Sequence, residues 1–314
     1  MIRELTIFEF EEFANNHILS SYHQSKEYAT IAAQKGYDYE YVGYVNSSDK
    51  IVAAALIVYK KIGMFYYYGY APKGFLIDYL DLTLLSFFTQ EIKEYYSKRG
   101  FAFIKINPEL AIGEVDPKRE YATIYNENMR IKNTLINLGY IKLKDNMYFE
   151  SMIPRFNAIL PLKTLSAESI GKNSRNKLKQ GLRKGLELVK GTKFDIDKFF
   201  DLIKDKNLYD ANYYKDYYNV FEKDDKIDLF FVKINYETYL VNCRDLHERE
   251  LQINADYNAE LVRNNSQTNI NKKMQSDKLL SSYKSDIIEA TAGLGRDSSA
   301  FIAGALVKIG RAHV

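Results

Sequence analysis

Residues 235–291 form two long polar runs with a sparse apolar repeat, and this pattern strongly limits the possible folds. In the first run the apolar residues fall near the a and d positions of a heptad, and Glu250 interrupts the repeat. Residues 264–268 (NNSQT) have no periodicity and predict a tip, after which a second amphipathic run begins. The seam residues are Tyr236, Tyr239, Cys243, Leu246, Ile253 and Tyr257, then Ile270, Met274, Leu280, Tyr283 and Ile287. We therefore expect an antiparallel coiled-coil hairpin whose weak seam makes it an arm rather than part of a core.

The hydrophobic cores must then come from the sequence on either side of the arm. Helical patterns are expected at 6–36, 80–99, 128–139, 171–193, 196–207 and 213–221, and strands at 38–59 (two), 63–71, 101–108, 140–149, 227–234 and 301–309. Strands that alternate with helices predict an α/β or α+β layered fold. The predicted boundaries are 1–152 for a first domain, 153–234 for the first part of a second, 235–291 for the arm, and 292–314 for the return into the second domain.

Composition excludes several classes of protein. One cysteine and four scattered histidines among 314 residues exclude a disulfide framework, a zinc ribbon and a His-rich metal centre. The sequence has no run of about 18 apolar residues, and its beginning (MIRELTIFEFEEF) is acidic where a signal peptide is basic. We therefore expect a cytoplasmic protein without a metal or a transmembrane span.

The near-neutral net charge of +3 hides one strongly basic segment. Residues 171–193 carry eight basic residues and one acid, which leaves the rest of the chain slightly acidic. One interpretation is a structural amphipathic helix, capped by Ser174, that buries Leu178, Leu182 and Leu186. The other is a face that binds phosphates of RNA or of a pyrophosphate. The scarcity of compensating acids favours the second, and its candidate residues are Arg175, Lys177, Lys179, Arg183 and Lys184.

Four segments in this order resemble the Fem (FemABX) peptidyl transferases over nearly the whole chain. They are residues 22–25 (YHQS), 70–81 (YAPKGFLIDYLD), 103–108 (FIKINP) and 174–191. The resemblance implies two tandem acetyltransferase-like (GNAT) domains, with the arm inserted in the second. It also implies transfer of Gly, Ala or Ser from aminoacyl-tRNA to the stem-peptide amine of a peptidoglycan precursor, either lipid II or UDP-MurNAc-pentapeptide. Peripheral contact with the cytoplasmic face of the membrane is compatible with the lipid-linked substrate.

The same resemblance implies a set of substrate-binding residues. They are Gln24, Tyr70, Lys73, Gly74, Asp78 and Asn107. Each also has a structural interpretation: Lys73 and Gly74 lie in a turn, and Asp78 could cap the next helix. Asn107 stands where the family commonly has Asp, so it cannot act as a base. The family's phosphate-binding cations are absent near Ala32 and Ala211, which argues for a lipid-linked acceptor or an altered function.

The implied reaction requires no cofactor, because the ester of the aminoacyl-tRNA co-substrate is already activated. No covalent nucleophile is evident, and the catalytic residues stay unassigned. Two rival functions stay open: an acyl-CoA-dependent N-acyltransferase, for which residues 180–185 (QGLRKG) approach the pyrophosphate-binding pattern, and a non-catalytic module that binds tRNA or the cell envelope. Residues 309–314 (IGRAHV) match a sequencing adapter, so we expect the natural second domain to continue beyond them.

Overall fold

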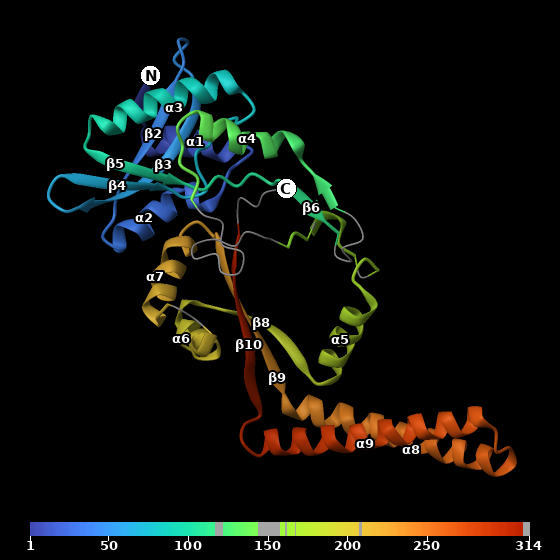
Figure 1. Ribbon diagram of the computed structural model, residues 1–314. Helices are drawn as coiled ribbons and strands as arrows, with labels where there is room; N and C mark the ends of the chain where they lie inside the picture. Colours follow the sequence, from blue (N-terminus) through green and yellow to red (C-terminus); the bar gives the residue numbers. More distant parts are fainter. Residues whose placement is uncertain (117–121, 144–157, 161, 167, 207–208, 310–314) are drawn as a thin grey trace. The chain divides into compact units, whose positions relative to one another are not determined.

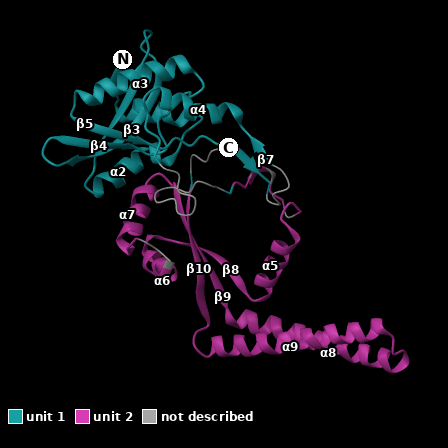
Figure 2. Ribbon diagram, viewed as in Figure 1, with its two compact units in different colours: residues 1–158, 309–314 teal, residues 159–308 magenta. Residues whose placement is uncertain are grey.

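The computed structural model describes all residues except 117–121, 144–157, 161, 167, 207–208 and 310–314 (Figure 1). The chain divides into two compact units, the first built on residues 1–158 and the second on residues 159–308 (Figure 2).

The first unit is a five-stranded sheet with helices on both faces. Its strands follow the order β1-β2-β3-β4-β5, and only β4 and β5 are parallel. The strands are β1 (Ile2–Glu4), β2 (Asp38–Val45), β3 (Ile51–Ile62), β4 (Tyr66–Ala71) and β5 (Phe101–Ile106). The helices are α1 (Ile7–Asn16), the short η1 (Tyr22–Gln24), α2 (Lys26–Gln34), α3 (Leu82–Ser97) and α4 (Asn126–Asn137).

Strand β3 has an apolar face on each side, and this fixes the layers. Ala53, Ala55 and Ile57 pack with α3 and with Ile131 of α4, whereas Ala54, Leu56 and Val58 pack with α1 and α2. A strand that is buried on both faces reads as a continuous apolar run, which explains the sequence IVAAALIV. The predicted strands at 38–59 and the predicted helix at 80–99 are confirmed, and Gly100 ends the helix with φ of +78°.

Several local predictions in this unit were wrong. Residues 6–36 form two helices and a 3-10 turn instead of one helical run. Strand β5 is not buried as predicted. It lies at the edge of the sheet, and Phe103 is 55% exposed. The strand expected at 140–149 is absent from residues 140–143, and 144–149 lie outside the described residues. The short strands β1, β6 (Gly113–Val115) and β7 (Ala122–Ile124) were not foreseen.

The second unit repeats the connectivity of the first three strands of the first. Its antiparallel sheet has the order β10-β9-β8, and two helices connect β8 to β9 as α1 and α2 connect β1 to β2. The strands are β8 (Leu186–Gly191), β9 (Ile227–Asn235) and β10 (Ser299–Lys308), and the helices are α6 (Ile196–Ile203) and α7 (Ala211–Glu222). Where the first unit has the short turn between β2 and β3, the second has the arm (Figure 1).

The arm is the predicted helical hairpin of α8 (Tyr236–Arg263) and α9 (Gln267–Leu294). The side chain of Asn235 caps α8 and that of Ser266 caps α9. Glu250 does not break the seam as expected but lies buried within it, followed by Asn254. The Asn254 amide donates to Ser276 Oγ at 2.9 Å and to Asp277 Oδ1 at 2.9 Å. The seam therefore buries polar side chains toward the tip, while Leu240, Cys243 and Ala290 pack together near the base.

A partly buried ionic network closes the base of the arm. The Tyr239 hydroxyl lies 2.8 Å from Asp286 Oδ1 and 2.9 Å from Glu289 Oε2. The Lys184 ammonium lies 3.2 and 3.1 Å from the same two oxygens. Burial and the two carboxylates raise the pKa of Tyr239, so its hydroxyl stays protonated and its single hydrogen is shared between both acceptors. The Lys184 ammonium offsets one of the two negative charges.

Replacing Tyr239 by Phe is expected to weaken the base of the arm. The change removes a buried hydroxyl that donates to charged acceptors, so we expect a loss of about 1–3 kcal/mol in local stability. Hydrogen exchange of the α8 and α9 amides measures this loss. Tyr257→Phe, nearer the tip with its ring against Lys272, is the matched control, and equal exchange in the two variants would contradict the role of the network.

Candidate functional site

A turn at the end of β4 brings several predicted residues together. Ala71 is followed by Pro72, Lys73 and Gly74, and Lys73 adopts a left-handed backbone with φ of +54°. The Gly74–Phe75 peptide bond is cis. A Cβ at Gly74 would lie 3.0 Å from Gln24 Nε2, so the close approach of Gln24 favours glycine here.

Gln24 holds this turn against the sheet. Its side chain is fully buried. The amide Nε2 donates to Pro72 O at 2.8 Å and to Leu56 O at 3.2 Å, and Oε1 accepts from Leu56 N at 2.7 Å. Ser21 and Ser25 place Gln24 by capping η1 and α2. With its amide bonded to backbone groups, Gln24 positions the turn, and any effect on a substrate would be indirect.

Asn107 joins the turn to the end of β5. Its Oδ1 accepts from the Lys73 backbone N–H at 2.9 Å and from the Tyr70 hydroxyl at 3.0 Å. Burial raises the pKa of Tyr70 to about 12, although the bond to Asn107 opposes the shift. Tyr70 is therefore protonated at neutral pH and donates to Asn107.

Glu109 is a site residue that the sequence analysis missed. Its Oε1 lies 3.0 Å from the Lys73 ammonium, whose side chain is 9% exposed, while that of Glu109 is 29% exposed. Because β4 and β5 are parallel, the residues that follow both strands lie at the same sheet edge. The sequence offered one indication of Glu109: it is an acidic residue two positions after Asn107. Tyr70, Lys73, Asn107 and Glu109 thus form one cluster, which we call the β4–β5 site.

Asp78 has a separate, local role. Its Oδ1 accepts from Leu80 N at 2.9 Å, and its side chain is exposed. The cap of α3 is Asp81, which accepts from Leu84 N at 2.9 Å, so the alternative of Asp78 as the helix cap was wrong.

The basic segment is a helix followed by a strand. Helix α5 (Lys172–Arg183) ends before Gly185, which has φ of +68°, and residues 186–191 form β8. Gly171, not Ser174, occupies the N-cap position. Leu178 is 58% exposed and Leu182 71% exposed. The interpretation of α5 as a helix that buries its leucines was therefore wrong for Leu178 and Leu182, whereas Leu186, on β8, packs against the core cluster at the base of the arm.

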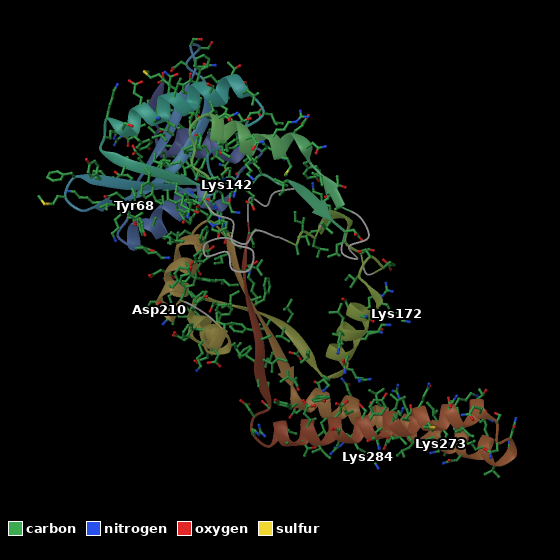
Figure 3. All side chains as sticks on the ribbon, viewed as in Figure 1. Tyr68, Lys142, Lys172, Asp210, Lys273 and Lys284 are labelled. Atoms are coloured by element: carbon green, nitrogen blue, oxygen red, sulfur yellow. The ribbon has the colours of Figure 1, made fainter. Side chains whose placement is uncertain are left out.

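The five predicted phosphate-binding cations fall into two groups. Lys177 and Lys179 are exposed on α5, as is Lys172 at its start (Figure 3), and Arg175 donates to Glu168 O at 2.9 Å. Arg183 and Lys184 face the arm instead. The Arg183 guanidinium lies over the Tyr283 ring, and Lys184 joins the ionic network at the base of the arm.

Residues 180–185, which approach a pyrophosphate-binding pattern, lie in the last turn of α5 and its C-terminal cap. The pyrophosphate-binding loop that this pattern describes uses backbone N–H groups at the start of a helix. This position offers the opposite end, and it weakens the case for acyl-CoA binding.

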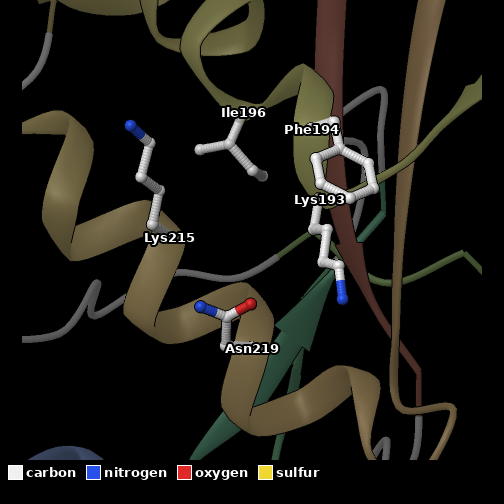
Figure 4. Close-up of a pocket in the computed structure, with 5 residues that line it drawn as sticks. All are labelled: Lys193, Phe194, Ile196, Lys215 and Asn219. Carbon is white, nitrogen blue, oxygen red and sulfur yellow. The ribbon is translucent and has the colours of Figure 1, made fainter.

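A hollow of about 210 Å³ in the second unit is lined by Lys193, Phe194, Ile196, Lys215 and Asn219 (Figure 4). Lys215 lies 2.7 Å from Asp197 and Lys193 lies 3.9 Å from Glu222. Because carboxylates compensate both ammonium groups, this hollow is a weaker anion site than the exposed part of α5. Among the described residues, no cluster of His, Cys, Asp or Glu has the geometry of a metal site.

Comparison with known proteins establishes the family. The FemAB family model matches residues 5–311. The chain belongs to the FemAB family. Aminoacyltransferase FemA of Staphylococcus aureus (strain N315) is 24% identical over 266 residues, 82% of this chain and 62% of FemA. Staphylococcus epidermidis (strain ATCC 12228) FemA is 24% identical over 274 residues, 82% of this chain and 63% of FemA. The chain thus spans less than two thirds of the length of these relatives.

The fold is supported independently. The crystal structure of FemX superimposes with a TM-score of 0.67 at 17% identity, covering 98% of this chain and 77% of FemX. This likeness agrees with the predicted tandem GNAT-like fold. Of the described helices, none is both long enough and apolar enough to cross a membrane.

Cys243 is expected to be inert in the folded protein. Burial, followed by the nearby Asp286 carboxylate, raises the pKa of its thiol to about 11. At pH 8 the thiolate is then only about a thousandth of the total. We expect reaction with a disulfide reagent such as DTNB to be negligible in the folded chain and complete in 6 M guanidinium chloride. Rapid labelling of the folded chain would show that the thiol is accessible and ionised.

Proposed function

We propose that this FemAB family member is an aminoacyltransferase of peptidoglycan synthesis. It would transfer Gly, Ala or Ser from aminoacyl-tRNA to the stem-peptide amine of lipid II or UDP-MurNAc-pentapeptide, in the cytoplasm and without a further cofactor. The observation that carries the proposal is the family match over residues 5–311. The similarity to the aminoacyltransferase FemA supports it, as does the β4–β5 site, which lies at the carboxyl ends of two parallel strands, where open α/β sheets bind ligands.

The reaction sets two chemical requirements. The attacking amine has a pKa of about 10.4 when free, so it must lose a proton to react. Its nitrogen then bonds to the ester carbonyl carbon and the bond from that carbon to the ribose oxygen breaks. The nitrogen loses a second proton as the amide forms, and the ribose oxygen takes that proton.

In the proposed reaction Glu109 receives the proton from the amine. Its carboxylate is partly exposed beside Lys73, so it is accessible while the ammonium balances its charge. The Lys73 ammonium is a donor for the developing oxyanion or for a carboxylate of the substrate. Asn107 fixes the backbone of Lys73 and the hydroxyl of Tyr70, which reduces the reorganisation needed on substrate binding.

The exposed cations of α5 would contact phosphates, for which the tRNA and a lipid-linked precursor at the membrane surface are the two candidate sources. We assign this role to Lys177 and Lys179 with Arg175. Arg183 and Lys184 would instead hold α5 against the arm, since their charged groups face α8 and α9.

The direct test uses the purified protein. It is incubated with tRNA charged with Gly, Ala or Ser and with lipid II or UDP-MurNAc-pentapeptide, and mass spectrometry detects the extended stem peptide. We expect extension with one aminoacyl-tRNA. No extension with any combination would reject the proposal, and calorimetric binding of acetyl-CoA would favour the acyl-CoA-dependent alternative.

Replacing Glu109 by Gln tests the proton-acceptor role. We expect kcat to fall by about 10²–10⁴-fold with little change in KM, and Glu109→Asp to recover part of the activity. Glu12→Gln, an exposed acid on α1, is the matched control and should behave as wild type. If Glu109→Gln raises KM but leaves kcat unchanged, Glu109 binds substrate and another group accepts the proton.

A further inference from the structure

Helix α5 carries large apolar side chains that are exposed to solvent. All twelve of its residues are described, and none is buried. Leu178 and Leu182 are 58% and 71% exposed. They lie four residues apart, so they share one face on successive turns. Leu162, on the short turn η2 (Leu162–Thr164) that precedes α5, is 73% exposed.

The leucine face of α5 is bordered by cations. Successive residues of a helix are turned by about 100° around its axis. On this count Arg175, Lys179 and Lys172 lie along one side of the Leu178–Leu182 face. Lys177 lies along the other side. Residues 171–186 contain no acid that could compensate these charges. The exposed part of α5 is therefore a short basic amphipathic helix.

Neither earlier interpretation of this segment accounts for the leucines. A structural helix would bury them, and they are exposed. Contact with the phosphates of an RNA would use the cations but would leave both leucines in water, because backbone phosphates offer no apolar surface. A basic helix with large aliphatic residues on one face matches a bilayer surface, which presents anionic phosphates and an apolar layer beneath them.

We propose that α5 docks this protein on an anionic lipid bilayer. Leu178 and Leu182 enter the boundary between headgroups and acyl chains, while Lys172, Arg175, Lys177 and Lys179 contact lipid phosphates. The C-terminal end of α5 is held to the arm by Lys184, and Asn242 donates to Arg183 O at 3.1 Å. The helix is thus presented from a fixed base in the second unit.

One consequence concerns the acceptor, and it rests on the proposed function. Docking through α5 would bring the enzyme to the surface that holds a lipid-linked precursor. The lipid binding itself does not depend on transferase activity.

The test is co-sedimentation of the whole chain with vesicles. We expect binding to phosphatidylcholine vesicles that contain 30% phosphatidylglycerol, weak binding to pure phosphatidylcholine, and release by salt. Leu178→Ser with Leu182→Ser preserves the charge and should reduce binding at least tenfold. Lys177→Gln with Lys179→Gln should reduce it by about 25-fold, at roughly fivefold for each cation. Far-UV circular dichroism checks that the variants remain folded.

Leu80→Ser with Leu82→Ser, an exposed pair in the first unit, is the matched control and should bind like wild type. Absence of binding to the anionic vesicles overturns the proposal, as does equal binding by the Leu178/Leu182 variant. Binding to tRNA but not to vesicles, unchanged in that variant, would instead assign α5 to RNA. Transfer to the soluble UDP-MurNAc-pentapeptide needs no vesicle, so failure of lipid docking and failure of the proposed function are distinguishable.

Discussion

The parallel pairing of β4 with β5 determines where this protein can carry a site. Every other pair in the first sheet is antiparallel, so residues that follow two adjacent strands meet at one edge only here. Asn107 connects the two strand ends, because its Oδ1 accepts hydrogen bonds from the backbone N–H of Lys73 and from the hydroxyl of Tyr70. Gln24 fixes the same turn from the opposite side through Pro72 O and Leu56. The turn is therefore held from two elements before any substrate binds.

The second unit uses the same chain path for a different purpose. Its β8–α6–α7–β9–β10 order matches β1–α1–α2–β2–β3, and the arm replaces a tight turn. A long insertion at that point needs a rigid base, and Tyr239, Asp286, Glu289 and Lys184 provide one. This network also explains why the cations of the basic segment fall into two groups. Its last cations stabilise the arm, and the earlier ones stay at the surface.

The sequence predicted those elements that a single periodicity defines. The double-sided strand β3, the amphipathic α3 and the arm all follow from the spacing of their apolar residues. The end of α5 was missed because the pattern of leucines continues into β8, and only the positive φ of Gly185 separates helix from strand. The buried Glu250 was taken for a break because a carboxylate in a seam has no apolar signal. Glu109 was missed because its partner, Lys73, lies 36 residues earlier and meets it only through the β4–β5 pairing.

Position 107 is Asn in this chain, where the resembling family commonly has Asp. The contacts around Asn107 give a physical reason for this difference. A carboxylate at this position would accept the same two hydrogen bonds. It would also place a second negative charge close to the Glu109–Lys73 pair, where like charges disfavour each other's ionised forms. The neutral amide keeps the bonds to Tyr70 and Lys73 and leaves the Lys73 ammonium to Glu109. In the proposed reaction the positioning role therefore belongs to Asn107 and the proton-accepting role to Glu109, two functions that a single aspartate could not separate.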